Sequence, residues 1–387
     1  MFINFWYAAA LAAEVKQAPM RRRMLGQDFV LFRDSQGKAH CLSNTCTHRG
    51  GSLSGGKVIG DEVQCPYHGW RFGGDGRCSR IPSLGRDASV PARSRVDAYP
   101  TIERYGLVFA FLGDLPEAER PPIMDIAEFG ADGPLPGWAA TTQFFEWDID
   151  FQRSVENGID PAHNEFVHPT HGFSYANEET YQIKPLKIID SEWATGFFSE
   201  IWVPALPEEQ MRKASGRSDA GYIRSGTGHH GISSVWTFIN PSPTMHIYQY
   251  LFETPIDDDR TSLYLVNMRN FLIEPEHDQR MTTRNEYVAF QDRDVLSELH
   301  PVVTPRSQNH ELFMPSDQCV GLYRQKVAQW EARGWRIDTG AVRANRNKIA
   351  YAIPSPARRE QKGWVLDSVP LVATSATAAA AKAERVA

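Results

Sequence analysis

The chain has 387 residues, of which 42% are hydrophobic and 23% are charged, and its formal net charge is -6. This length predicts two or three packed domains, because a single hydrophobic core rarely grows beyond about 250–300 residues. The composition excludes disorder for most of the chain, and an acidic balance without a basic stripe excludes a nucleic-acid-binding surface. Small molecules or other proteins are therefore the expected partners.

The first fifteen residues are apolar, but their nearest arginines, which begin at Arg21, follow them rather than precede them. A signal peptide is therefore not expected. No stretch approaches about 18 uninterrupted apolar residues, so we expect no membrane span and a soluble, cytoplasmic protein. Five cysteines in such a chain favour metal ligation over a disulfide framework.

Residues 1–115 contain short strand-like runs, among them 29–32, 63–65 and 107–111, which are separated by glycine-rich turns. This pattern predicts a small all-β domain. The Pro-, Asp- and Gly-rich stretch 116–140 is predicted to be a linker.

Residues 141–371 combine strand-like runs with helical patterns at 151–167 and 277–298, which predicts an α+β domain on an antiparallel sheet. The strand-like runs are 141–149, 182–189, 196–203, 233–239, 244–252 and 261–269. The polar stretch 207–231 is either a flexible loop or lid over a site or a surface insertion. Residues 372–387 form a tail to which no function is assigned. Five aromatic residues of this domain are expected in the core rather than in a pocket: Phe151, Phe166, Trp236, Phe238 and Phe252.

Cysteine and histidine occur together in two short motifs. Cys46 and His48 form C-x-H, and Cys65 and His68 form C-x2-H after sixteen further residues. A Rieske [2Fe–2S] cluster needs two thiolates on one iron and two imidazoles on the other, so two loops that each donate one of each satisfy it. A structural zinc site is the alternative, but its usual spacing groups the cysteines together and the histidines together.

The residues around these motifs suit a cluster. Gly50, Gly51, Gly69 and Gly73 allow tight turns and offer amide groups to sulfur, and Trp70 is placed to shield the cluster from water. Neither motif contains an additional cysteine.

A second constellation begins at Asp160 and His163, which are three residues apart and share a face of the predicted helix 151–167. His168 lies off that face, but Pro169 is expected to end the helix, so that the second imidazole can turn back toward the first. Two imidazoles and one carboxylate hold non-haem Fe(II) and leave positions open for O2.

The carboxylate must come from elsewhere in the chain. Asp292, on the helical pattern 277–298, is the candidate, and Asp294 is the alternative. Either residue could instead be an ordinary solvated acid of the helix surface.

The sequences C-T-H-R-G and C-P-Y-H-G-W resemble the cluster motif of the Rieske non-haem iron oxygenases. The absence of extra loop cysteines separates them from the Rieske proteins of respiratory complexes. The later segment resembles the family's N-x2-D-x2-H-x4-H motif, and the segment around Asp292 resembles its carboxylate segment. The chain looks most like the branch of pheophorbide a oxygenase, vanillate O-demethylase and dicamba O-demethylase. The motif residues are Cys46, His48, Cys65, His68, Asn157, Asp160, His163 and His168.

The resemblance implies an N-terminal Rieske [2Fe–2S] domain with those first four residues as ligands, and a helix-grip catalytic domain. His163, His168 and Asp292 would hold mononuclear Fe(II). The resemblance also implies a homotrimer in which Asp160 connects the cluster of a neighbouring subunit to His163. Asn157 would lie near the open coordination side or merely begin the helix.

No G-x-G-x-x-G motif opens a βαβ unit, so electrons from NAD(P)H would arrive through a separate reductase or ferredoxin. The expected function is O2 activation for hydroxylation, oxidative demethylation or desaturation of a small aromatic or cyclic substrate. The alternatives are a cis-dihydroxylating dioxygenase and, from another class, a Rieske electron-transfer or ligand-binding protein without a working mononuclear iron.

Overall fold

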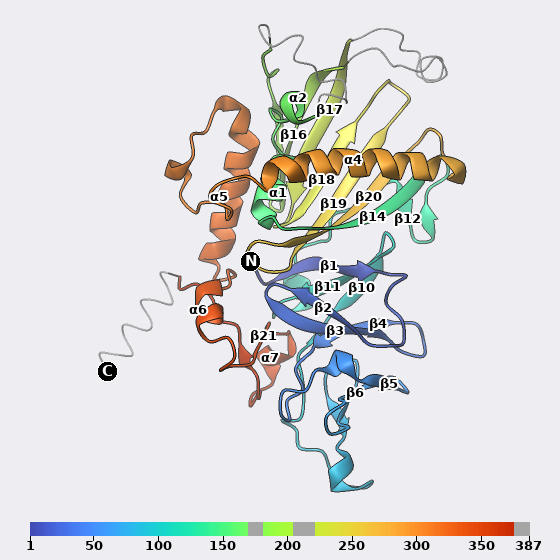
Figure 1. The fold of residues 1–387 in the computed structure, drawn as a ribbon, viewed down its shortest axis with the longest axis vertical. Helices are drawn as coiled ribbons and strands as arrows, with labels where there is room; N and C mark the ends of the chain where they lie inside the picture. Colours follow the sequence, from blue (N-terminus) through green and yellow to red (C-terminus); the bar gives the residue numbers. More distant parts are fainter. Residues whose placement is uncertain (169–180, 204–220, 375–387) are drawn as a thin grey trace. The chain divides into compact units, whose positions relative to one another are not determined.

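The computed structural model describes residues 1–168, 181–203 and 221–374, and the chain divides into two units (Figure 1). Unit 2 consists of Ile123–Glu253 and Asp259–Lys326. Unit 1 consists of Met1–Pro122, Thr254–Asp258 and the C-terminal part of the chain from Val327. Neither unit is therefore a single continuous stretch of sequence.

The N-terminal part of unit 1 contains three antiparallel sheets, with the strand orders β1-β11-β10, β2-β3-β4-β9 and β5-β6-β7-β8. The three predicted runs correspond to β3, β6 and β11. The strands are β1 (Phe5–Leu11), β2 (Met20–Met24), β3 (Gln27–Arg33), β4 (Ala39–Ser43), β5 (Lys57–Ile59), β6 (Glu62–Gln64), β7 (Arg71–Phe72), β8 (Cys78–Arg80), β9 (Ala98–Tyr99), β10 (Thr101–Arg104) and β11 (Leu107–Leu112). Short 3-10 helices lie at Leu53–Gly55, Pro82–Leu84 and Glu117–Glu119.

The C-terminal segment of the chain packs in unit 1, whereas the sequence had placed residues up to 371 in the catalytic domain. It contains α6 (Thr339–Ala344), β21 (Tyr351–Ala352), α7 (Ala357–Glu360) and β22 (Asp367–Ser368). The Ile3 N–H donates to the Trp335 carbonyl at 2.9 Å, and Arg358 forms a bidentate pair with the fully buried Asp97. These partners are over two hundred residues apart in sequence, so local patterns do not reveal them.

The predicted linker 116–140 also contains structure, namely a 3-10 turn, the hairpin of β12 (Phe129–Gly130) and β13 (Gly133–Pro134), and the start of β14 (Ala139–Trp147). The division between the units falls within it, after Pro122.

Unit 2 is built on a seven-stranded sheet with the order β14-β20-β19-β18-β17-β16-β15. β14 pairs antiparallel with β20, and β15 to β19 pair antiparallel in chain order. The predicted α+β class with an antiparallel sheet is confirmed. The remaining strands are β15 (Lys187–Asp190), β16 (Ala194–Val203), β17 (Gly221–His230), β18 (Ser234–Ile239), β19 (Ile247–Pro255) and β20 (Thr261–Arg269).

The prediction of a loop at 207–231 is wrong for its second half, because residues 221–230 form β17. Two glycines of this strand lie where the sheet leaves no room: a Cβ atom on Gly226 would clash with the Phe198 ring, and one on Gly228 would lie 2.6 Å from the Trp236 ring. Residues 207–220 and most of the predicted tail lie outside the described residues.

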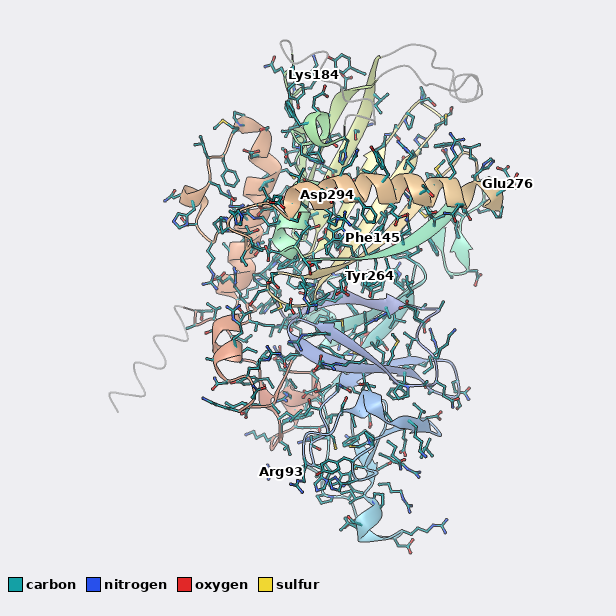
Figure 2. All side chains as sticks on the ribbon, in the orientation of Figure 1. Arg93, Phe145, Lys184, Tyr264, Glu276 and Asp294 are labelled. Carbon is teal, nitrogen blue, oxygen red and sulfur yellow. The ribbon has the colours of Figure 1, made fainter. Side chains whose placement is uncertain are left out.

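Helix α4 (Asp278–Leu296) crosses one face of this sheet and matches the helix predicted at 277–298 (Figure 1). Figure 2 shows Phe145 of β14 beside α4, and its ring contacts Phe290 edge-on at 6.1 Å. Helix α5 (Gln318–Ala332) follows, after 3-10 turns at Gln308–His310 and Pro315–Asp317. No helix in the described ranges is both long and apolar enough to span a bilayer.

The helix predicted at 151–167 is two helices, α1 (Phe151–Gly158) and α2 (Asn164–Val167). A Cβ atom on Gly158 would lie 2.9 Å from a Val235 methyl group, so glycine lets α1 end directly against β18. The Thr227 hydroxyl donates to the Gly158 carbonyl at 2.6 Å and satisfies one of the terminal acceptors. Pro161, which cannot donate a backbone hydrogen bond, lies in the connection.

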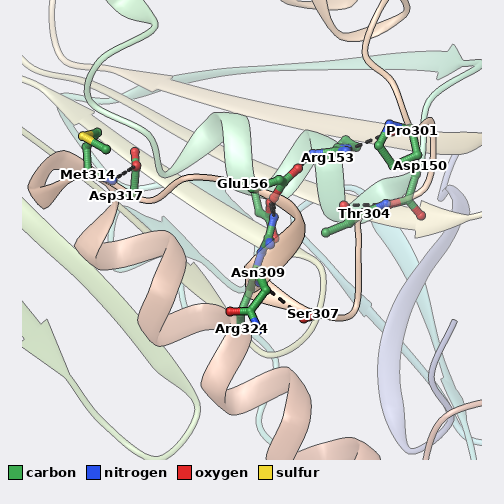
Figure 3. A network of polar contacts seen from close by, with 11 residues as sticks. Asp150, Arg153, Glu156, Pro301, Thr304, Ser307, Asn309, Met314, Asp317 and Arg324 are labelled. Atoms are coloured by element: carbon green, nitrogen blue, oxygen red, sulfur yellow. Dashed lines mark hydrogen bonds and ion pairs between the residues drawn. The ribbon is translucent and has the colours of Figure 1, made fainter.

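A buried network of charges fixes α1 to α5 (Figure 3). Arg324 of α5 forms a bidentate pair with Glu156 at 2.7 and 2.6 Å and also contacts Glu311 at 2.5 Å. Arg153 bonds the other Glu311 oxygen at 2.5 Å and the Pro301 carbonyl at 2.8 Å. The network holds the helix that ends next to the candidate iron site.

Candidate metal centres and their cavity

The loops that carry Cys46 and Cys65 have the same backbone hydrogen bonds. The Cys46 N–H donates to the Gly51 carbonyl and the Gly50 N–H to the Cys46 carbonyl, at 2.8 and 2.9 Å. In the second loop, which follows β6, the Cys65 N–H donates to the Trp70 carbonyl and the Gly69 N–H to the Cys65 carbonyl, at 2.8 and 3.0 Å. Gly50 and Gly69 have φ of 71° and 72°, which favours glycine at both turns.

The two loops present their cysteines inward and their histidines outward. Cys46 and Cys65 are 1% and 2% exposed within a core cluster, whereas His48 and His68 are exposed. Burial raises the pKa of the Cys46 thiol to about 12, and the neighbouring Cys65 thiol adds to this rise. Two adjacent buried thiolates therefore need positive charge beside them, and iron ions supply it.

The imidazoles also lie together, with His48 and His68 ring centroids 4.3 Å apart. Trp70 stacks on His48 at 4.7 Å, with the ring planes 5° apart. A Cβ atom on Gly51 would lie 2.8 Å from the Cys65 sulfur, so only glycine leaves that sulfur free on this side. Two thiols and two imidazoles grouped by type fit a Rieske [2Fe–2S] cluster.

In unit 2 the structure brings His163, His168 and Asp292 together, with one donor atom of each within 4.8 Å of the others. The Nε2 atoms of His163 and His168 lie 3.7 and 3.1 Å from Asp292 Oδ1. Ligands bound at right angles with bonds of about 2 Å are about 3 Å apart, so a single ion fits among them with little movement. His163 begins α2, His168 ends it, and Asp292 belongs to α4.

The other ring nitrogens are held by hydrogen bonds. His163 Nδ1 lies 2.8 Å from the Asp160 carbonyl, and His168 Nδ1 lies 2.9 Å from Gln291 Oε1. Both contacts leave Nε2 for a metal, as orienting partners of metal-bound histidines usually do. Gln291 was not predicted as a site residue from the sequence, where its position next to Asp292 is the one signal of such a role.

Asn157 orients the carboxylate, since its amide donates to Asp292 Oδ1 at 3.0 Å. It lies in the last turn of α1, so the option that it merely begins a helix is wrong. Burial raises the pKa of Asp292, but the hydrogen bond with His168 and the charges of His163 and His168 outweigh it, and the pKa is lowered overall. The carboxylate is therefore ionised and available to a cation.

Asp294 is excluded from this cluster by its position on the helix. Two residues correspond to about 200° of rotation around an α-helix, so Asp294 points away from Asp292. Its side chain is 68% exposed and pairs with Arg293 at 2.7 Å (Figure 2).

Asp160 lies between α1 and α2 and not on a helix face shared with His163. Its Oδ1 accepts the Ala162 N–H at 2.7 Å, and its Oδ2 lies 3.8 Å from His163 Nδ1. Burial raises the pKa of Asp160, and the charge of His163 opposes this rise.

A cavity of about 540 Å³ opens at the candidate iron site, between the sheet and α4. Because strand side chains alternate between faces, every second residue along parts of β18 and β19 lines it. The lining includes Val235, Thr237 and Ile239 of β18 and Gln249, Leu251 and Glu253 of β19. Its size is typical of small-molecule sites.

None of the five aromatic residues considered from sequence lines this cavity. Phe151, Phe252 and Trp236 are buried in the core as expected, whereas Phe166 is 44% exposed. The aromatic residues that line the cavity are Trp147, Tyr181, Phe197 and Tyr222. Trp147, Phe197 and Tyr222 lie on strands, and only the register of these strands, which the sequence pattern alone does not give, identifies them as lining residues.

Comparison with known proteins agrees with both parts of the site. Residues 5–100 match the Rieske [2Fe–2S] domain family, and residues 147–333 match the vanillate O-demethylase oxygenase C-terminal domain. The chain belongs to the Rieske oxygenases. This confirms the resemblance found in the sequence motifs.

Among the relatives of this Rieske oxygenase chain is the oxygenase component of chloroacetanilide N-alkylformylase from Rhizorhabdus wittichii, 38% identical over 43% of this chain and 47% of the relative. The iron–sulfur subunit of the toluene-4-sulfonate monooxygenase system of Comamonas testosteroni is 32% identical over 48% of this chain and 51% of the relative. The matches thus span about half the length of these relatives.

The solved structure of dicamba monooxygenase bound to dicamba has a TM-score of 0.67 and covers 84% of this chain and 96% of that one. At 21% sequence identity this similarity establishes the shared fold of the Rieske oxygenases.

Proposed function

We propose that this chain is the oxygenase component of a Rieske system that oxidises a small aromatic or cyclic molecule with O2. The observation that carries the proposal is the His163–His168–Asp292 cluster at a cavity lined by alternating side chains of a sheet. Relatives named for chloroacetanilides and toluene-4-sulfonate support a ring-containing substrate. Hydroxylation and oxidative demethylation are both compatible with the cavity.

Cys46, Cys65, His48 and His68 would hold the [2Fe–2S] cluster, and the three cavity residues would hold mononuclear Fe(II). When bound, these centres supply one-electron transfer and O2 activation. The protein orients the ligands through Asn157 and keeps the reacting group against apolar strand residues.

Electrons from NAD(P)H would enter through a separate reductase or ferredoxin at the exposed His48 and His68. A homotrimer would place Asp160 between the cluster of one subunit and His163 of the next. The trimer and the cytoplasmic location stay predictions.

The test is metal analysis of the purified protein together with EPR after dithionite reduction. We expect about three irons and two sulfides per chain with a Rieske-type signal. A His163→Ala/His168→Ala variant is expected to keep two irons and that signal. Nitric oxide, a probe for ferrous iron with an open position, is expected to add an EPR signal in wild type and not in the variant.

The matched control is His277→Ala/His310→Ala, which removes two histidines of the same unit away from the cavity. It is expected to retain the wild-type metal content. Two irons in wild type and no response to nitric oxide would contradict the proposal and favour an electron-transfer protein.

A further inference from the structure

Two side chains of the cavity lining carry a positive charge that the iron site does not use, Lys184 and Arg284. Lys184 lies over the Tyr222 ring, with its Nζ 5.0 Å from the ring centroid, so Arg284 is the cation without such a contact. Arg284 of α4 lines the cavity together with Val288 and Asp292. These residues are spaced by four, so they lie along one face of the helix. The eight residues from Arg284 to Asp292 correspond to a rise of about 12 Å.

Arg284 has no polar partner among the residues that the structure describes. Over the described ranges, no hydrogen bond or ion pair joins its guanidinium to another group, although its side chain is accessible from the cavity. Burial lowers the pKa of Arg284, the nearby charge of Arg280 lowers it further, and no acidic group offsets these effects. The side chain is exposed at the cavity wall, where no acidic group of the described residues neutralises its charge.

Nearby groups of the lining are engaged with one another. Gln249 donates to Asn285 Oδ1 at 3.4 Å, and Asn285 donates to Gln143 Oε1 at 3.3 Å. The acidic residues in the lining are Asp160, Glu165, Glu200, Glu253 and Asp292. Asp160 and Asp292 contact the histidines, Glu253 bonds Ser154, and neither Glu165 nor Glu200 pairs with Arg284. None of these contacts involves Arg284, so its guanidinium is left to a molecule in the cavity.

We propose that Arg284 binds a carboxylate or sulfonate group of the substrate and thereby holds the opposite end of the molecule near the iron ligands. The substrate class would then be a small ring-containing acid whose anionic group lies far from the oxidised carbon. The planar guanidinium offers two parallel N–H groups, which match the oxygens of either anion. This inference rests on the proposed function and adds the substrate's charge and orientation.

The test measures binding to the metal-loaded protein by isothermal titration calorimetry without turnover. The probes are 4-methoxybenzoate, 4-methoxybenzenesulfonate and the neutral analogue 4-methoxybenzamide. We expect at least one anion to bind wild type about 10- to 100-fold more tightly than the amide, as for a charge-assisted hydrogen bond. Arg284→Gln is expected to remove that preference while leaving amide affinity unchanged, and Arg284→Lys to restore part of it.

The control is Arg280→Gln, which removes the same charge from the same helix and is expected to keep the preference. If Arg280→Gln loses it equally, or if neither anion binds wild type at millimolar concentration, the inference is wrong. Metal content and EPR are measured on the same samples. If the protein holds both metal centres but binds the anions no more tightly than the amide, only the role of Arg284 is wrong. If the protein lacks the mononuclear iron, the proposed function is contradicted.

Discussion

Replacing Arg324 with methionine is expected to destabilise unit 2 strongly. Arg324 and Glu156 are 8% and 10% exposed, and Arg324 also neutralises Glu311. Methionine fills similar space, but it leaves a buried carboxylate on α1 without its bidentate partner. Removing one member of a buried ion pair costs about 3–5 kcal/mol.

At about 2–4 °C per kcal/mol for a unit of this size, the expected fall in Tm is about 6–20 °C. Burial raises the pKa of Glu156 even though Arg324 lowers it. Without Arg324 the pKa rises further, and a carboxyl whose folded-state pKa is raised destabilises the fold above that pKa. The difference in Tm between wild type and Arg324→Met is therefore expected to become smaller as the pH falls from 8 to 5.5.

The assay is thermal unfolding of metal-loaded wild type, Arg324→Met and the control Arg260→Met at one scan rate. Arg260 pairs with Glu146 at 3.7 Å on the surface, where such a pair contributes about 0–1 kcal/mol. Adding Glu156→Gln to Arg324→Met is expected to recover part of the loss, because it removes the unpaired charge. A Tm for Arg324→Met within about 3 °C of the control would refute the reasoning.

Three further predictions concern single positions. Gly51→Ala is expected to abolish the Rieske EPR signal, because its Cβ atom would lie 2.8 Å from the Cys65 sulfur. Asp292→Asn is expected to lose the mononuclear iron, whereas Asp294→Asn retains it, since only the former meets the histidines. His229 is fully buried, and burial lowers its pKa to about 3, so the unfolded chain binds its proton first as the pH falls below about 6.5. Protonation of His229 alone is expected to lower the free energy of unfolding by about 2 kcal/mol between pH 6.5 and 5. The variant His229→Gln is therefore expected to show a smaller decline in Tm over that pH range.

For each of these three predictions, one experimental result would contradict the structural reasoning. A full Rieske signal in Gly51→Ala would mean that the loops move enough to admit a methyl group. Equal iron loss in the two aspartate variants would mean that the helix face is assigned wrongly. The control for His229 is the partly exposed His277, whose replacement by glutamine is expected to leave the pH dependence unchanged. If His229→Gln is as acid-sensitive as wild type, other groups cause the decline.

The grouping of the candidate site residues could be predicted from the sequence because the chemistry of such a site depends on residue types at short spacings. The pairs Cys46/His48 and Cys65/His68 lie in loops with equivalent backbone bonds, and a cluster imposes that spacing. The assignment of Asp292 rested on a long helical pattern, and α4 is a helix of nineteen residues. Long, periodic elements are those that sequence patterns indicate best.

What the sequence did not reveal depends on contacts between distant residues. The break between α1 and α2 follows from the packing of Gly158 against Val235 and from its bond with Thr227. Arg284 lacks a polar partner among the described residues because of the side chains that pack around it in the fold. A helical pattern in the sequence shows only that the residue is charged. Likewise, glycines at 226 and 228 indicate a turn by composition but belong to β17.

The division of unit 1 between the two ends of the chain has a consequence for its biosynthesis. The buried Asp97 carboxylate gains its guanidinium partner only when Arg358 has left the ribosome. In the same way, the Ile3 N–H can donate to the Trp335 carbonyl only after Trp335 has been synthesised. Unit 1 therefore cannot reach its native packing during translation until nearly the whole polypeptide has emerged, although its cysteine motifs are among the first to appear.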